Sequence, residues 1–386
     1  MFFYFFGIAD LFFLMENFMN IKKVALVALG LSTSVAYAQS NVTLYGVVDI
    51  GYIKETGRDI RMGDNDNNRL GFRGVEDLGN GWKAIFNVER RFDLNDGTPG
   101  NSNTASYKGS KNAKQKDWDG ATFVGLASEK WGQVQLGRVN ELSTETIRKF
   151  DPFNQIGIGS QIYSVQRNAR IDNTIRYNSP SWSGLTFGAS YSLGGNTRGE
   201  NAIAPSLSGA DNDGYGINLS YNNGPFSSTA NWSRVADSND SSVWNIGLAY
   251  KILPDLRLSA SYEDTNSKGW KGGNGAAAGT TANPDGYSSA LKAREKNLLV
   301  GLGWNVGPGR LDGSVQYNRL KDTAFLADTA DSYKYSVGYT YFLSKRTSLY
   351  GFLAYTDYGD KDTGNFYSGL KRDSVTGVQL GMTHKF

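Results

Sequence analysis

Apolar and polar side chains alternate from residue 40 to the end of the chain, in runs of about ten residues. In the first run, Val42, Leu44 and Val48 alternate with Thr43 and Tyr45. Because successive side chains of a β-strand point to opposite faces, each run predicts a strand with one apolar and one polar face. The chain is therefore expected to be all-β, with a sheet that meets an apolar medium on one side and water on the other.

Short and long connections alternate between these runs. Seven are tight turns rich in the Gly, Asn, Asp and Pro that turns require, at residues 77–81, 128–132, 181–184, 222–225, 253–255, 305–309 and 343–346. Eight are longer polar segments, near residues 54–67, 94–119, 140–169, 193–213, 236–241, 265–293, 321–330 and 357–372. Seven hairpins hold fourteen strands, and a first strand near 42–53 and a last near 373–386 make sixteen.

An even number of strands with short turns on one side and long loops on the other is typical of a bacterial outer-membrane barrel. Closure pairs every strand edge, which lipid demands because no water reaches bare N–H and C=O groups there. The pattern thus predicts a 16-stranded antiparallel transmembrane β-barrel with short periplasmic turns and long extracellular loops. A barrel of this size encloses an aqueous channel.

A soluble sandwich or propeller is the alternative fold. A propeller requires a blade repeat of roughly 40 residues, and the sequence has no such repeat. Aromatic residues also cluster beside the turns, as they do in the girdles at a membrane surface: Trp82, Trp131, Trp182, Tyr341 and Tyr350.

The beginning of the chain predicts export. Residues 19–38 combine a basic start, an apolar stretch and an Ala36-Tyr37-Ala38 site, which is typical of a signal peptide cleaved after Ala38. The apolar stretch is well short of the roughly 20 residues of a membrane-spanning helix. Residues 1–18 are apolar and Phe-rich, which signal peptides do not normally add, so translation is expected to start at Met19; the alternative is a genuine extended signal.

The composition offers few of the residue types that enzymes use for catalysis. The chain has no Cys and a single His, His384, which lies in the last strand pattern. Disulfides, thiolate catalysis and Cys-ligated metal are excluded, and no nucleotide loop, zinc spacing or nucleic-acid patch is present. The expectation is a protein that is not an enzyme and uses no cofactor or metal.

Four motifs resemble one protein family. The stretches are 40–49 (SNVTLYGVVD), 69–81 (RLGFRGVEDLGNG), 132–138 (GQVQLGR) and 381–386 (GMTHKF). They are similar to the first strand, the second hairpin, the strand before the third loop and the terminal strand of the Gram-negative general porins, in the version of Neisseria-like and Burkholderia-like bacteria. The resemblance covers essentially residues 40–386, so residues 39–386 are expected to form the porin barrel.

The resemblance implies a homotrimer in the bacterial outer membrane, each barrel with its own channel for small hydrophilic solutes. It also implies outer-membrane lipid and lipopolysaccharide as surroundings, with no nucleic acid. The terminal Phe386 resembles the signal that the outer-membrane assembly machinery reads. A third loop, here 140–169, is expected to fold inward and to place acidic residues opposite arginines on the barrel wall.

The candidate residues follow from that likeness and from strand phase. The acids of the third loop are Glu141, Glu145 and Asp151. The wall arginines are Arg73, Arg91, Arg138 and Arg170. Simple alternation places Arg138 on the face of Val134 and Leu136. Either a bulge at Gly137 turns it inward, or the strand has already left the membrane there. The loop departs from the Pro-Glu-Phe-Gly pattern of enterobacterial porins and contains cations of its own, Arg148 and Lys149.

The expected mechanism is passive diffusion. Opposed charges across a narrow, low-dielectric constriction create a transverse field that favours small hydrophilic solutes. Lys22 and Lys23 balance Asp10 and Glu16 in the removed segment, so the mature chain keeps a net charge near +3, which predicts weak anion preference. Two alternatives remain: a substrate-preferring channel, for example for anions or small organic acids, and an adhesin-like or structural barrel with a closed lumen.

Overall fold

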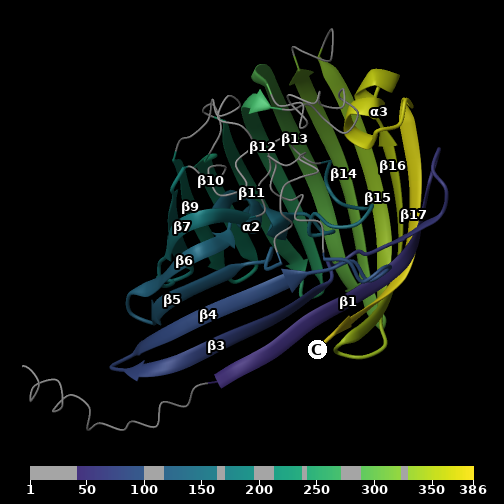
Figure 1. Ribbon diagram of the computed structural model, residues 1–386. Helices are drawn as coiled ribbons and strands as arrows, with labels where there is room; N and C mark the ends of the chain where they lie inside the picture. The colour runs from purple at the N-terminus through teal and green to yellow at the C-terminus, as the bar shows by residue number, and fades with distance from the viewer. Residues whose placement is uncertain are drawn as a thin grey trace, which may run out of the picture.

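The computed structural model describes residues 41–99, 117–162, 170–194, 213–236, 241–270, 288–322 and 329–386. Its strands form one antiparallel sheet that closes on itself, because β1 (Asn41–Glu55) pairs with both β3 (Arg69–Gly79) and β17 (Ser374–Lys385). Figure 1 shows this barrel from the side. The expected signal peptide, its cleavage at Ala38 and the extension 1–18 lie outside the described residues.

The remaining strands pair with their neighbours in chain order. They are β4 (Trp82–Arg91), β5 (Thr122–Ser128), β6 (Gly132–Asn140), β7 (Arg170–Asn178), β8 (Leu185–Ser192), β9 (Gly214–Asn223), β10 (Phe226–Arg234), β11 (Ser242–Leu253), β12 (Leu256–Trp270), β13 (Ser288–Val306), β14 (Gly309–Asp322), β15 (Ala330–Phe342) and β16 (Thr347–Asp357). The barrel is therefore built of sixteen strands, and the seven expected tight turns join them in hairpins. A short additional strand, β2 (Arg61–Gly63), pairs with β1 in the first long connection.

Two long connections differ from expectation. The segment 265–293 was expected to be a loop, but β12 continues to Trp270 and β13 begins at Ser288. The polar residues there break the apolar alternation because these strands continue beyond the apolar belt. The segment 357–372 contains a helix, α3 (Lys361–Ser368), where a loop was expected. No helix in the described ranges is long and apolar enough to cross a membrane.

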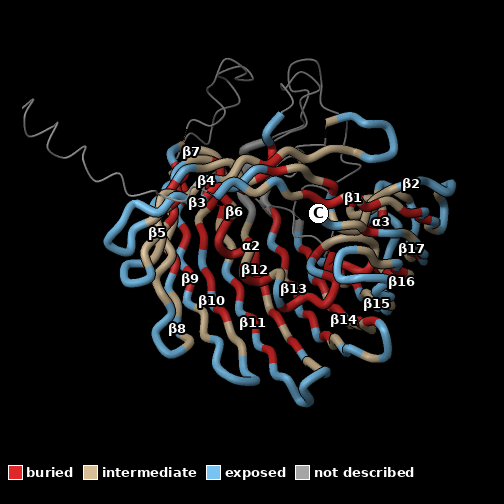
Figure 2. Tube along the Cα trace, turned by 90° about the horizontal axis from the view of Figure 1, so that it is seen from below, coloured by how far each residue is buried: buried red, intermediate tan, exposed pale blue. Residues whose placement is uncertain are grey.

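The two faces of the sheet differ as the alternation requires. On β11, Trp244, Ile246 and Leu248 are exposed on the outer surface, whereas Asn245 between them is buried on the inner side. Figure 2, a view from below, shows buried residues along the strands and exposed residues at the turns that join them. Such an inverted pattern, apolar outside and polar inside, suits a barrel that faces lipid.

Candidate pore constriction

The third long connection lies against the inner wall of the barrel. After β6 it forms helix α2 (Leu142–Ile147) and a short 3-10 helix (Arg148–Phe150), and α2 contacts β8, β9, β10 and β11. Figures 1 and 2 show α2 inside the ring of strands. We call residues 141–162 the internal loop; residues 163–169, which complete the connection, lie outside the described ranges.

Hydrogen bonds to inward-facing side chains hold the internal loop along the wall. They join Thr146 Oγ1 to Asn231 Oδ1 (2.8 Å), Ile158 N to Gln379 Oε1 (3.1 Å), Ile162 N to Gln316 Oε1 (2.8 Å) and Lys334 Nζ to Ser160 O (2.6 Å). The partners belong to β10, β17, β14 and β15, so the loop runs around much of the circumference. Asn231, Gln316 and Gln379 are buried, so breaking one of their contacts would leave an unsatisfied polar group.

Glycines on the wall, which have no side chain, make room for the loop. A Cβ at Gly247 would lie 2.5 Å from the Phe150 ring, and one at Gly301 would lie 2.4 Å from Pro152. Further along, Phe153 packs edge-on against Phe352, with ring centroids 5.5 Å apart. The loop is thus seated in close van der Waals contact on glycines of β11 and β13, which fixes its distance from the wall.

Two of the three expected loop acids accept hydrogen bonds that shape the loop and do not contact a wall arginine. Glu141 caps α2: its carboxylate accepts from Thr144 N at 2.8 Å and from the hydroxyls of Ser143 and Ser233. The carboxylate of Asp151 is buried and accepts from the backbone N–H groups of three loop residues, Phe153, Gln155 and Gln161. Burial raises the pKa of Asp151 above its ordinary value, although these N–H groups oppose the shift.

Glu145 is the loop acid that contacts a wall arginine. Its carboxylate forms an ion pair with Arg176 of β7, whose guanidinium also donates to Asn140 O and to Asn178 Oδ1. Burial alone would raise the pKa of Glu145, but the Arg176 guanidinium outweighs it and holds the pKa below its ordinary value. The acid is therefore ionised at neutral pH and contacts its cation directly, without an intervening gap.

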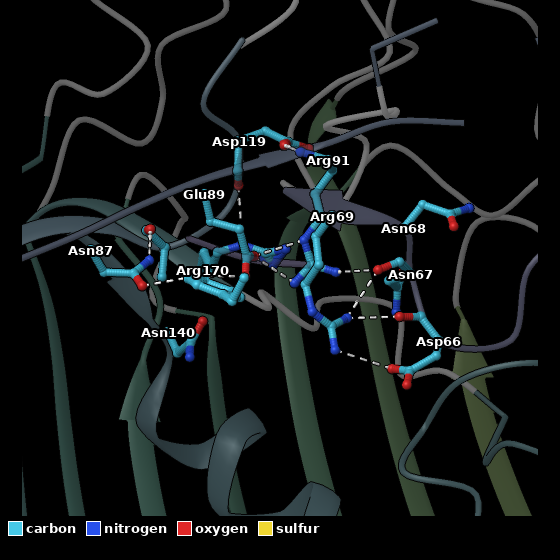
Figure 3. Close-up of polar contacts among 12 residues, drawn as sticks. Asp66, Asn67, Asn68, Arg69, Asn87, Glu89, Arg91, Asp119, Asn140 and Arg170 are labelled. Carbon is cyan, nitrogen blue, oxygen red and sulfur yellow. Dashed lines mark hydrogen bonds and ion pairs between the residues drawn. The ribbon is translucent and has the colours of Figure 1, made fainter. Parts of the chain in front are cut away.

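Three of the four expected wall arginines converge on one segment. Arg138 Nε and Arg170 Nε both donate to the backbone oxygen of Asp119, at 2.9 and 3.0 Å, and Arg91 N donates to the Asp119 carboxylate at 2.9 Å. The Arg91 guanidinium also pairs with Glu89 at 2.8 Å. Figure 3 shows Arg91, Arg170, Glu89 and Asp119 together. We call Arg91, Arg138 and Arg170 the arginine cluster.

The expected bulge explains how Arg138 joins this cluster. The pairing of β6 with β7 shifts register between Gly137 and Val139, and Gly137 has φ +138°, a conformation that L side chains rarely adopt. Arg138 is buried and forms an ion pair with Asp172.

The fourth expected arginine, Arg73, stands apart from the cluster and is exposed. It pairs in register with Asn87 and lies over the Tyr45 ring, 5.2 Å from the centroid. The Tyr45 hydroxyl donates to Glu89 at 3.1 Å, so one tyrosine lies between the exposed arginine and the cluster.

Strand phase and family likeness missed several charged groups near these arginines. Arg69 pairs with Asp66 at 3.3 Å, as Figure 3 also shows. This group then contains six arginines (Arg69, Arg73, Arg91, Arg138, Arg170 and Arg176) and five acids (Asp66, Glu89, Asp119, Asp172 and the loop acid Glu145), and Lys385 also pairs with Asp66, at 2.6 Å. Simple alternation would have placed Arg69 with Arg73 on the inner face.

Helix α3 was not expected and lies at the extracellular end of the lumen (Figure 1). Its side chain Phe366 packs with Ala293 and Leu320, and the Tyr367 hydroxyl bonds to Glu295 and Asn318, each at 2.8 Å. Two sequence signals mark this helix: Asp360 caps its first turn, and Gly369 ends it with φ 71°.

The last residue takes part in closing the barrel. Phe386 N donates to Gly46 O at 3.1 Å, and Gly46 N donates to Phe386 O at 3.0 Å. The Phe386 ring lies over Gly46, where an added Cβ would come within 2.4 Å of it. Among the described residues, no group of three or more His, Cys, Asp or Glu side chains could hold a metal ion.

A closed antiparallel barrel with an apolar outside, a polar inside and a long segment folded into its lumen defines a membrane channel. Residues 25–361 match the family model of the Gram-negative porins. The chain therefore belongs to this family, whose members are channel proteins rather than enzymes, and its location is the bacterial outer membrane.

Individual relatives agree with this assignment. The chain is 29% identical to an outer membrane porin of Bordetella pertussis over 95% of this chain and all of that protein. It is 28% identical to outer membrane porin protein 32 of Delftia acidovorans, over 94% and 100%. Among solved structures, the anion-selective porin from Comamonas acidovorans has a TM-score of 0.68 at 24% identity, covering 90% of this chain and 100% of that one, a likeness of fold.

Proposed function

We propose that this chain forms a passive diffusion channel for small hydrophilic solutes and ions, filtered between the internal loop and the arginines of β3 to β7. The observation that carries the proposal is the seating of the loop: hydrogen bonds to four strands and ring contacts on two glycines hold it inside the barrel. A segment so anchored narrows the channel permanently. The acid of this filter is Glu145, while Glu141 and Asp151 shape the loop.

The arrangement of charge would then act as a field across the narrow part of the channel. Arg73 and the arginine cluster, Arg91, Arg138 and Arg170, supply the positive side. Fixed charges in a low-dielectric constriction orient water and dipolar solutes. Apolar solutes must displace that ordered water, so small polar solutes pass preferentially. Ion preference follows local charge, and the excess of cations in this group, six arginines and Lys385 against five acids, supports a weak preference for anions.

Reversal potentials in planar bilayers under a salt gradient test this proposal. The wild-type channel is expected to conduct and to favour anions weakly. Neutralising Arg73 and Arg170 together, as Arg73→Gln and Arg170→Gln, should widen the passage and move the preference toward cations. A cation-selective wild type would overturn the predicted sign, and unchanged conductance and selectivity in the double variant would remove these arginines from the filter.

A substrate-preferring channel for anions or small organic acids is the second candidate. The cation excess on the wall favours it, as does the structural likeness to a porin described as anion-selective. Adding a small dicarboxylate to the bilayer chamber separates the two functions. A specific site would give saturable block of the chloride current, whereas a general channel would show only the change expected from ionic strength.

The assembly proposal is a homotrimer in outer-membrane lipid and lipopolysaccharide, inserted with the help of a terminal signal at Phe386. The contacts of Phe386 with β1 support a role for this residue in closing the barrel. Deleting Phe386 should slow insertion in cells, and the yield of folded protein in the outer-membrane fraction measures it.

A further inference from the structure

A second segment of the chain turns into the lumen beside the internal loop. One edge of β1 pairs first with β3 and further along with β2, and residues 64–68 cover the gap between these two pairings. There Asn65 N donates to Asp49 Oδ1 at 2.7 Å, and Asp49 N donates to Asn68 Oδ1 at 2.6 Å. Asp49 is fully buried and shares the inward phase of Tyr45, so these contacts lie on the lumen side of β1. We call residues 64–68 the inner turn.

The inner turn meets the last part of the internal loop. The fully buried side chain of Gln379 joins them, because its Nε2 donates to Asp64 O at 3.0 Å and its Oε1 accepts from Ile158 N at 3.1 Å. Asn65 also packs on Gly157, where an added Cβ would collide with Asn65 Oδ1. The two inward segments therefore contact each other, and the lining of the narrow part continues from the internal loop onto the inner turn.

Backbone oxygens of the inner turn hold two wall arginines. Arg69 Nη1 donates to Asp66 O at 2.7 Å and to Asn67 O at 2.9 Å, and Arg91 Nη1 donates to Asn67 O at 3.3 Å. Figure 3 shows these four residues together. Asn67 has φ 46°, a left-handed conformation that asparagine adopts more readily than most residues, and both carbonyl groups reach the Arg69 guanidinium. The inner turn thus contacts the arginine cluster directly, through Arg91.

The carboxylate of Asp66 lies between two cations from different strands. Its Oδ1 is 3.3 Å from Arg69 Nη2, and its Oδ2 is 2.6 Å from Lys385 Nζ. Arg69 of β3 and Lys385 of β17 are the partners of Val47 on its two sides, and Arg69 in turn pairs in register with Arg91. Three cations therefore stand in one row across β17, β1, β3 and β4, and one carboxylate contacts two of them.

We propose that Asp66 is a positioning residue of the filter, which sets ion selectivity by holding and neutralising Arg69 and Lys385 together. This inference rests on the channel function proposed above. The side chains of Asp66 and Lys385 are 20% and 56% exposed, so water and ions of the lumen reach this pair. A partly exposed ion pair contributes little to stability, and its charge therefore acts mainly on passing ions. Glu145 neutralises one arginine, whereas loss of the Asp66 charge would release two cations.

Reversal potentials of the purified native protein in planar bilayers test this role. Asp66→Asn keeps a hydrogen-bonding side chain of the same shape and removes the charge, so the anion-to-cation permeability ratio is expected to rise at least about threefold. Asp66→Ser should shift the ratio in the same direction, and Asp66→Glu should keep it near the wild-type value. The matched control is Asp59→Asn, which removes an exposed carboxylate from the same long connection and should leave the ratio unchanged.

A double-substitution cycle shows whether Asp66 acts through Lys385. In the wild type Asp66 holds the ammonium at the wall, so Lys385→Gln should lower the permeability ratio only slightly. In the Asp66→Asn background the released ammonium faces passing ions, and the same substitution should lower the ratio at least about twofold. Equal shifts in Asp66→Asn and Asp59→Asn, or effects of Asp66→Asn and Lys385→Gln that simply add, would overturn the proposal. Each shift is measured relative to the wild type, so these comparisons decide the role of Asp66 whatever the sign of the wild-type preference, which belongs to the proposed function.

Discussion

At the scale of single residues, Glu145 is the loop acid whose loss should change the channel most directly. Its carboxylate neutralises Arg176, and Glu145→Gln would leave that guanidinium as an added positive charge beside the passage. Arg176 keeps its bonds to Asn140 and Asn178, so it stays in place. We expect the anion-to-cation permeability ratio to rise about two- to fivefold, as a change of roughly 0.4–1 kcal/mol gives. Reversal potentials in planar bilayers measure this ratio.

A matched control for this substitution lies in a periplasmic turn. Glu129→Gln removes the same charge from a side chain that is almost fully exposed, at 3.8 Å from Lys83. It should leave the permeability ratio unchanged. A similar shift in both variants would mean that overall charge, rather than the Glu145–Arg176 pair, sets the selectivity.

The lowered pKa of Glu145 predicts how selectivity depends on pH. A carboxyl group whose pKa is lower in the folded state stabilises that state above the unfolded pKa, and this contribution is lost as the pH falls through the folded value. The ordinary value is 4.5 and the folded value lies below it. From neutral pH down to about pH 5, Glu145 should therefore stay ionised, and its effect on the permeability ratio should stay constant. In stronger acid the wild type should move toward anions, and Glu145→Gln should lack that part of the shift. Parallel titration curves for the two proteins would contradict this assignment.

At the scale of elements, the internal loop depends on glycines in the wall behind it. Gly301→Val on β13 would place side-chain atoms where Pro152 now lies, because even a Cβ would come within 2.4 Å of it. Overpacking of this kind costs about 1–3 kcal/mol, and the loop, being held less firmly than the strand, should move toward the passage. Conductance is expected to fall, and single-channel recording measures it.

The neighbouring strand offers a control for Gly301→Val. Gly313 of β14 faces outward, and an added Cβ there would meet nothing closer than 3.7 Å. Gly313→Val should fold and conduct as the wild type does. Combining Gly301→Val with Pro152→Ala should restore most of the lost conductance; failure of this rescue would show that the valine acts through the strand and not through the loop.

Helix α3 makes a second prediction at this scale. Tyr367→Phe keeps the ring but removes the hydroxyl that bonds to Glu295 and Asn318. The loss of two hydrogen bonds costs about 0.5–1.5 kcal/mol each, so α3 should open more often, and added protease should cleave the last long connection faster in intact cells. Tyr333→Phe, on the outer face of β15, is the control. Equal cleavage rates in the wild type and Tyr367→Phe would show that this anchor does not hold the helix.

Sequence alternation predicts elements well and their ends less well, for a physical reason. Strand number and turns depend on a two-residue period that lipid on one side and water on the other impose over the whole barrel. That constraint ends at the membrane surface, so alternation does not predict that β12 continues to Trp270 or that β13 begins at Ser288. Helix α3 is too short for a clear apolar period, although its two caps, Asp360 and Gly369, were visible in the sequence.

The roles of the loop acids could not be predicted in the same way. A carboxylate that caps a helix, such as Glu141, one that binds backbone N–H groups, such as Asp151, and one that pairs with an arginine, such as Glu145, are alike in an irregular segment. Which role each takes depends on contacts between residues far apart in the chain. Arg138 is the clearest case. Strict alternation predicts that it faces outward, whereas the bulge at Gly137, with its positive φ, explains its inward position.

At the scale of the whole molecule, the pairing of β1 with β17 means that each chain closes its own barrel. An oligomer would then contain as many independent channels as chains, because no wall is shared. If the proposed trimer forms, the unheated oligomer should insert into a bilayer with three equal conductance steps. Mixed oligomers of wild-type and Gly301→Val chains should show two step sizes in the ratio of the chains, since each internal loop narrows only its own lumen. A single step of intermediate size would mean that the channels are coupled, which sixteen strands closed within one chain do not allow.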